Sequence, residues 1–178
     1  MKALLVIDML NDFIDKSGSM QCGDAGREII PFIKDQISCF HKNNDKVFFV
    51  CDNHNEDDKE FEHFPKHCIK DSWGSQIAAD LTPKQNDIII LKKRYSAFFQ
   101  TNIESMLKDC NEIHFVGVCT NICILFSVEE AYNRGFKTVI YKNGVASFDA
   151  EAHKFLCLIF LEILYFFSMP QVAPVCTS

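Results

Sequence analysis

The stretch best suited to covalent chemistry ends in a cysteine placed just after a buried strand. An apolar run that includes Val116 leads through Gly117 to Thr120 and Cys123. Thr120 is a typical helix N-cap, because a hydroxyl can accept a hydrogen bond from a free backbone N–H in the first turn. We therefore predict that Cys123 occupies the third helical position, where free N–H groups and the helix dipole stabilise a thiolate. Such a sulfur can attack a carbonyl carbon while nearby N–H groups hold the oxyanion.

The same cysteine also has a structural interpretation. Cysteine is among the residue types most often buried as inert filler, and this chain contains nine of them. Cys119 competes with Cys123 for the reactive role, but it precedes the predicted cap and so lies outside the first turn. Helix geometry favours Cys123, and the rest of the support must come from other parts of the chain.

Two charged residues could serve such a thiol. A cysteine that acts on an amide needs a group that accepts its proton and later protonates the leaving amine, and a carboxylate can do both. Asp8 ends the first apolar run, and Lys92 follows a run of isoleucines. A nearby lysine would lower the pKa of the thiol and keep the carboxylate charged. The alternative is an ion pair that only ties two strand ends together.

A second group has the composition of a metal site. Asp52 and His54 follow another buried strand, and His67 lies in the loop after it. One carboxylate and two imidazoles suit Zn²⁺, Fe²⁺ or Mn²⁺ and leave positions open for water or substrate. Pairs of Asp and His at this spacing are also common on protein surfaces, so the motif alone is a hypothesis.

Aromatic residues near these positions could stack on a flat ring. They are Phe13, Phe64, Trp73, Tyr95 and Phe98. The chain has 17 phenylalanines, however, and most of these are expected to pack in the core.

The elements that must position these residues alternate along the chain. Short apolar runs predict buried strands, and apolar residues at helical spacing predict helices between them. The predicted strands span residues 3–7, 47–51, 87–91, 112–117 and 136–141, with a sixth at 172–175. The predicted helices span residues 25–43, 101–110 and 121–134, and a last helix runs from about residue 150 and ends before Pro170. A long polar loop covers residues 53–75. This alternation indicates a three-layer α/β/α fold of Rossmann-like type, with a mostly parallel sheet of five or six strands.

The predicted sheet would bring the reactive side chains together. In open α/β sheets, ligands bind beyond the carboxyl ends of the strands. Asp8, Asp52, Lys92 and the pair Cys119 and Cys123 each lie at or just after such an end. Four strands would thus deliver polar or reactive side chains to one rim, which is not expected of a chance core cysteine.

Composition narrows the class of protein. The chain has 178 residues, of which 48% are hydrophobic, so we expect one domain, residues 1–178, with a substantial core. Its 18 Lys and Arg against 24 Asp and Glu give a net charge of -6, which argues against nucleic acid as a partner. The cysteines are scattered and form no CxxC pair, so we expect reduced thiols and a cytoplasmic location.

Two apolar segments could suggest a membrane. The N-terminal run is too short for a signal peptide. The segment 155–167 is shorter than the roughly 20 residues of a bilayer span. We expect no membrane partner and interpret residues 155–167 as a helix that faces the core, with a subunit interface, and hence a homo-oligomer, as the alternative.

Three motifs that occur in this order carry a family resemblance. They are LVIDMLNDF at residues 5–13, KKRYSAF at 92–98 and GVCTNIC at 117–123. Together they resemble the isochorismatase-like cysteine hydrolases over nearly the whole chain. The resemblance implies a catalytic triad of Asp8, Lys92 and Cys123. It also implies a cis peptide before Cys119, with the backbone N–H groups of Cys119 and Cys123 forming the oxyanion hole.

Within that family, the Asp-x-His pair and the Phe-Pro-x-His stretch at 64–67 are similar to the nicotinamidase branch. The similarity implies one divalent metal ion, zinc first and iron or manganese as alternatives, held by Asp52, His54 and His67, with Glu60 as a further contact. It also implies that Phe13, Phe64 and Tyr95 flank the substrate ring. Asn121 and Asn143 depart from the family pattern, which often has aspartate at both positions.

The expected activity is hydrolysis of nicotinamide to nicotinate and ammonia through a cysteine thioester, in the salvage of nicotinamide for NAD. Pyrazinamide, a near isostere, should also be a substrate. Two alternatives stay open. The same triad could act on another small amide or ureido compound, or the chain could be a non-catalytic binding protein on this fold.

Overall fold

A computed structural model describes residues 1–164 of the chain and the side chains of residues 1–160. Five strands form its centre: β1 (Lys2–Ile7), β2 (Lys46–Asp52), β3 (Ile88–Lys92), β4 (Glu112–Val118) and β5 (Lys137–Ala146). The helices are α1 (Asn11–Ile14), α2 (Gly23–Glu28), α3 (Ile30–Lys42), α4 (Ile103–Leu107), α5 (Leu125–Asn133) and α6 (Ala150–Leu164), with short turns η1 (Lys59–Glu62), η2 (Ala79–Leu81) and η3 (Thr120–Ile124).

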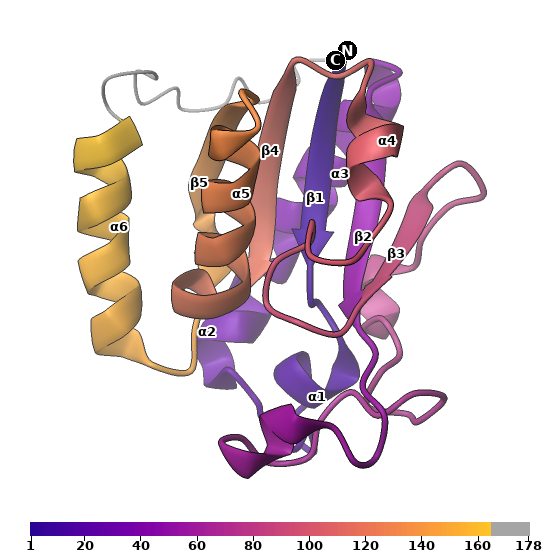
Figure 1. The fold of residues 1–178 in the computed structure, drawn as a ribbon, viewed down its shortest axis with the longest axis vertical. Coiled ribbons are helices and arrows are strands. Elements are labelled where there is room, and N and C mark those ends of the chain that lie inside the picture. Colours follow the sequence, from indigo (N-terminus) through magenta and orange to yellow (C-terminus); the bar gives the residue numbers. More distant parts are fainter. Residues whose placement is uncertain (165–178) are drawn as a thin grey trace.

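The five strands form one parallel sheet in the order β3-β2-β1-β4-β5. Helix α3 lies on one face, while α4 and α5 lie on the other (Figure 1). The predicted three-layer α/β fold is therefore confirmed. All five predicted strands are present, although β5 continues five residues beyond its predicted end, past an irregularity in its pairing with β4. The sixth strand predicted at 172–175 lies outside the described residues.

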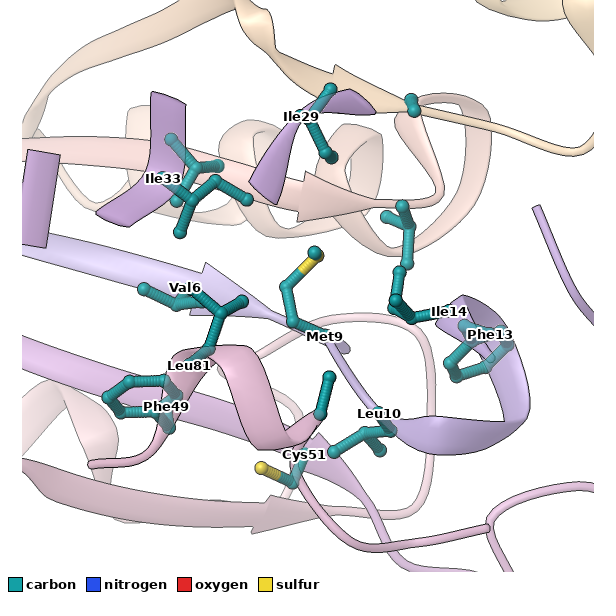
Figure 2. Close-up of a cluster of buried hydrophobic side chains, with 14 of the residues drawn as sticks. Val6, Met9, Leu10, Phe13, Ile14, Ile29, Ile33, Phe49, Cys51 and Leu81 are labelled. Carbon is teal, nitrogen blue, oxygen red and sulfur yellow. The ribbon is translucent and has the colours of Figure 1, made fainter. Parts of the chain in front are cut away.

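The core has two layers because each central strand is buried on both faces. Along β1, Leu4 and Val6 join the cluster beneath α3, whereas Leu5 and Ile7 join the cluster beneath α4 and α5. Figure 2 shows part of the first cluster, in which Met9 and other residues that follow β1 continue its apolar surface. The segment that follows β1 is therefore anchored by packing in the core.

The helix predicted over residues 25–43 is two helices. Ile29 separates α2 from α3, and Pro31 stands in the first turn of α3. Proline has no N–H to give to a preceding turn and is favoured at a helix start, which explains the break. The helix predicted over 101–110 is also shorter, since α4 covers Ile103–Leu107 only.

Helix α6 does not match the expectation of a core-facing helix over its described part. Leu156 is buried, but Phe155 and Leu158 are 62% and 55% exposed. The hydrophobic composition that suggested burial therefore leaves large apolar side chains on the surface. Among the helices in residues 1–164, none has the length and apolarity needed to cross a bilayer.

Gly117 is the position where the sheet tolerates least change. Its φ is +117°, and an added Cβ would lie 2.0 Å from the backbone oxygen of Ile7 on the neighbouring strand. Gly135 also has a positive φ, +82°, but an added Cβ there would meet nothing within 4 Å. Substitution of both glycines would therefore distinguish the cost of a positive φ, which both positions share, from the cost of a steric clash, which arises only at Gly117.

We expect Gly117→Ala to lower the free energy of unfolding by at least about 3 kcal/mol, because β1 cannot move away without loss of its core contacts. Gly135→Ala should cost only about 1 kcal/mol, the conformational penalty alone. Urea denaturation of both variants measures the difference. Equal losses would mean that the close approach to Ile7 is relieved at little cost.

Candidate functional site

A buried lysine lies at the centre of the site. The Nζ atom of Lys92 is 2.8 Å from Oδ2 of Asp8 and 2.6 Å from Oδ1 of Asp52. It also donates a hydrogen bond to Sγ of Cys123 at 3.5 Å. All four side chains are nearly inaccessible to solvent. The structure thus brings the three predicted triad residues together and adds Asp52 to them.

Sheet register accounts for this convergence. Asp52 and Lys92 are paired residues at the ends of β2 and β3. Asp8 follows β1 in a left-handed conformation, with φ of 52°, and its backbone N–H donates to the carbonyl of Val50 at 2.8 Å. The backbone N–H of Asp52 in turn donates to Oδ1 of Asp8 at 2.9 Å. Three neighbouring strands therefore fix the carboxylates and the ammonium relative to one another.

The local prediction around Cys123 was wrong in two respects. Cys119, not Thr120, is the N-cap residue, and the turn from Thr120 to Ile124 is of π type. Cys123 is therefore the fourth helical residue, counted from Thr120. The hydroxyl of Thr120 is hydrogen-bonded to Nδ1 of His153 at 2.8 Å and so caps no N–H. The chain is already extended at Cys119, with ψ of 142°, which places the helix start one residue earlier than predicted.

The thiol is also not the stabilised thiolate that the sequence suggested. Burial raises the pKa of Cys123 well above its ordinary value, and the charge of Lys92 offsets this only in part. Burial and the neighbouring charge of Asp52 raise the pKa of Asp8 to about 6, against the opposing effect of Lys92. Burial thus favours the protonated form of the Cys123 thiol, while a carboxylate oxygen of Asp8 lies within 4.8 Å of its sulfur.

The peptide bond between Val118 and Cys119 is cis, as the family resemblance implied. Cys119 and Cys123 both line a small pocket that is partly open to solvent. The Sγ atom of Cys119 lies 3.5 Å from that of Cys22, away from the Lys92 cluster. A carbonyl group bound in this pocket would lie beside the segment predicted to supply the oxyanion hole.

The predicted metal ligands gather around Asp52. Ligand atoms of Asp52, His54 and His67 all lie within 4.8 Å of one another, and the three side chains are buried. Nε2 of His54 is 3.6 Å from Oδ1 of Asp52, and Nε2 of His67 is 4.0 Å from Oδ2. Oε1 of Glu60 lies 3.8 Å from Nε2 of His67. All four predicted ligands are therefore in one place.

The histidines are oriented as ligands would be. Nδ1 of His67 is 2.8 Å from the carbonyl oxygen of Pro65, and Nδ1 of His54 is 3.2 Å from a carboxylate oxygen of Asp58. Nε2 of His54 is buried without a hydrogen-bond partner among the described residues. A buried nitrogen with a free lone pair, beside a second imidazole and a carboxylate, fits a divalent ion.

The two acidic groups of this cluster differ in charge. Burial disfavours the ionised form of Asp52, but Lys92 and His54 outweigh burial and hold its pKa at about 2. Burial and the negative charge of Asp52 raise the pKa of Glu60 to about 7. Asp52 is therefore an anion shared by Lys92 and the histidines, whereas Glu60 is easily protonated.

A second set of donor atoms, from Asp8, Asp52 and Cys123, also has the spacing of a metal site. The ammonium group of Lys92 contacts all three of these side chains. A cation already occupies this position, so the set formed with His54 and His67 is the one suited to a metal.

Three predicted ring contacts, Phe13, Phe64 and Tyr95, line the pocket. The other two aromatic candidates do not. Trp73 is 49% exposed, and Phe98 is buried in the core. Three further residues were not predicted from the sequence: Met20 and Ile122, which also line the pocket, and Asp58, which contacts His54. Only Asp58 had a signal in the sequence, since it lies four residues after a predicted ligand.

The chain is similar in sequence to a known protein family and to individual members of it. Residues 2–160 match the Isochorismatase domain. The chain is 39% identical over 164 residues to the uncharacterized isochorismatase family protein PncA of Bacillus subtilis, which covers 85% of this chain and 90% of that protein. It is 30% identical over 164 residues to a probable inactive nicotinamidase of Arabidopsis thaliana, over 85% of this chain and 83% of that protein.

A solved structure agrees with the fold. The crystal structure of nicotinamidase PncA from Bacillus subtilis superposes with a TM-score of 0.86 at 36% identity, covering 92% of this chain and 96% of that one. The arrangement of the sheet and its helices is therefore shared with a hydrolase of this family along nearly the entire length.

The buried charges predict a large effect of Lys92 on stability. Lys92→Met would leave Asp8 and Asp52 as adjacent buried acids without a counter-charge, so we expect the free energy of unfolding of the metal-free protein to fall by about 3–5 kcal/mol. Lys93→Met changes an exposed neighbour of the same type and should cost well under about 1 kcal/mol. Urea denaturation at neutral pH compares them, and equal effects would contradict the central position of Lys92.

Proposed function

We propose that this chain, which belongs to the isochorismatase family, is a metal-assisted nicotinamidase. It would convert nicotinamide and water to nicotinate and ammonia through a thioester on Cys123. The observation that carries the proposal is that Cys123 belongs to both parts of the site. Its sulfur accepts a hydrogen bond from Lys92 and lies near Asp8, and it lines the pocket that Asp52, Glu60 and His67 also line.

The first half of the reaction forms the acyl-enzyme. Asp8 accepts the proton of the Cys123 thiol as the sulfur attacks the carboxamide carbon. The negative charge passes to the carbonyl oxygen, where the backbone N–H groups of Cys119 and Cys123 stabilise it. Asp8 then gives the proton to the amide nitrogen, the C–N bond breaks and ammonia leaves. The product is a thioester, and Asp8 is again a carboxylate.

The second half regenerates the thiol. Asp8 removes a proton from a water molecule, whose oxygen attacks the thioester carbon. The C–S bond breaks, the proton returns from Asp8 to the sulfur, and the acid product ionises to nicotinate. Lys92 transfers no proton in this scheme. Burial opposes its charge, but Asp52 and Asp8 outweigh burial and hold the pKa of Lys92 well above its ordinary value, so it stays cationic throughout.

Asp52, His54 and His67 would hold the metal ion, with Glu60 as a further contact and zinc as the preferred ion. When bound, the ion would orient and polarise the ring through the pyridine nitrogen. Phe13, Phe64 and Tyr95 supply flat apolar surfaces around the same space, which suits a single aromatic ring. Pyrazinamide has the same shape and should also be cleaved.

The proposed setting is the recycling of nicotinamide toward NAD in a cytoplasm that keeps thiols reduced. Cys51, Cys68, Cys110 and Cys123 are free thiols, which suits such a compartment.

Cys123→Ala should lower ammonia release from nicotinamide by a factor of roughly 10³ or more, because no thioester can form. The matched control is Cys110→Ala, which removes another buried thiol of the same sheet face that does not line the pocket. Its activity should equal that of the unchanged protein. Turnover that survives in Cys123→Ala would exclude the covalent mechanism.

Removal of metal should abolish ammonia release, and addition of Zn²⁺ should restore it. The measurement is release from nicotinamide before and after chelator treatment. The His67→Ala variant should lose both the ammonia release and its dependence on Zn²⁺. His63 is an exposed histidine of the same loop, and the His63→Ala variant should retain both. Activity unaffected by thorough chelation would keep the cysteine chemistry and reject the metal. No release with metal present would redirect the assignment to another small amide or ureido compound.

A further inference from the structure

One carboxylate outside the predicted site joins several of its parts. Asp58 is 6% exposed at its side chain and lies just before η1. Its Oδ2 is 3.2 Å from Nδ1 of His54, and its Oδ1 accepts a hydrogen bond from the backbone N–H of Glu60 at 3.0 Å. Nη1 of Arg94 donates to both oxygens, at 3.0 and 3.1 Å. No function discussed so far uses this residue.

We propose that Asp58 is a positioning residue for the metal site, one that orients His54 and Glu60 together. This inference rests on the metal site of the proposed function. It does not depend on the identity of the amide substrate. The Asp58 side chain contacts His54, the backbone N–H of Glu60 and Arg94, and among the described residues it makes no hydrogen bond or ion pair with Asp8, Lys92 or Cys123.

The first effect is on the ring of His54. A neutral imidazole carries one proton, and the nitrogen that lacks the proton is the one able to bind a metal. A carboxylate beside Nδ1 holds the proton there and leaves Nε2 unprotonated. In this structure Nε2 is the buried nitrogen without a partner among the described residues, and it points to the side of Asp52. The contact therefore selects both the tautomer and the orientation that a ligand needs.

The second effect is on Glu60. The Asp58 side chain caps η1, the short turn that carries Glu60, by accepting from its backbone N–H. The cap fixes where the turn starts, and Oε1 of Glu60 is then 3.8 Å from Nε2 of His67. One side chain thus sets the position of two of the four proposed ligands.

Arg94 connects this arrangement to the substrate pocket. It lies between Lys93 and Tyr95, two residues after Lys92, and its guanidinium balances the charge of Asp58. An alternative is that Asp58 and Arg94 form an ion pair that only ties two loops together. The two interpretations differ in which variant should disturb the metal.

The test measures zinc affinity, not turnover, by competition with a chromophoric chelator. Asp58→Asn should raise the dissociation constant for Zn²⁺ by about 10- to 100-fold, as loss of a carboxylate partner of a ligating histidine does. Asp57→Asn removes the same charge from the exposed neighbouring residue and should change it by less than about twofold, because exposed charges are screened. Arg94→Gln leaves the contact with His54 and should have a smaller effect than Asp58→Asn.

A spectroscopic measurement on the unchanged protein guards against a variant that fails to fold. The ¹⁵N chemical shifts of the His54 ring in the metal-free protein, at a pH where the ring is neutral, should show a protonated Nδ1 and an unprotonated Nε2. The opposite tautomer would overturn the proposal. So would an affinity in Asp58→Asn equal to that of the unchanged protein, or an equal loss in Asp57→Asn.

The outcomes separate this inference from the proposed function. A protein that binds Zn²⁺ with the predicted dependence on Asp58, yet releases no ammonia from nicotinamide, would support the role of Asp58 and reject the nicotinamidase. A protein that binds no Zn²⁺ would overturn both the metal site and the role of Asp58.

Discussion

The interaction on which the rest of this structure depends is the ion cluster formed by Lys92 with Asp8 and Asp52. A buried ammonium is tolerated only where carboxylates balance it with good geometry. Asp8 directly follows β1, Asp52 ends β2 and Lys92 ends β3, so three strands must be in register before the charges are neutralised. The conditions for folding and for assembling the site are therefore largely the same.

Much of this could be predicted from sequence because the strands are short apolar runs that end in a charged or polar residue. Asp8, Asp52 and Lys92 each follow such a run, and parallel strands bring their carboxyl ends to one rim. The apolar run predicts the strand, and the polar residue after it predicts where the strand ends. Pro31 is a residue favoured at a helix start, but the apolar residues on both sides of it have helical spacing, which predicted one helix where the structure has α2 and α3.

Other features depend on the path of the chain in space. Residues 53–75 have no periodicity, so only the spacing of four residues points to a contact of Asp58 with His54, and nothing in the sequence indicates that Met20 reaches the pocket wall from another loop. The acidity of Cys123 was mispredicted for a related reason. Position in a helix can be counted along a sequence, whereas complete burial, which dominates its pKa, follows from the packing of segments that are distant in the sequence.

The carboxylate of Asp52 is shared between the ammonium group of Lys92 and two imidazoles. Oδ1 contacts Lys92 at 2.6 Å, while both oxygens face the imidazoles of His54 and His67. Because this carboxylate carries a single negative charge, its pairing with Lys92 weakens its interaction with a positive charge held by the histidines, and the reverse is also true. Thermodynamic reciprocity then requires that occupancy of the histidine side and the ionic state of the cysteine side influence each other by the same free energy. A single shared side chain makes the two halves of the site one coupled system.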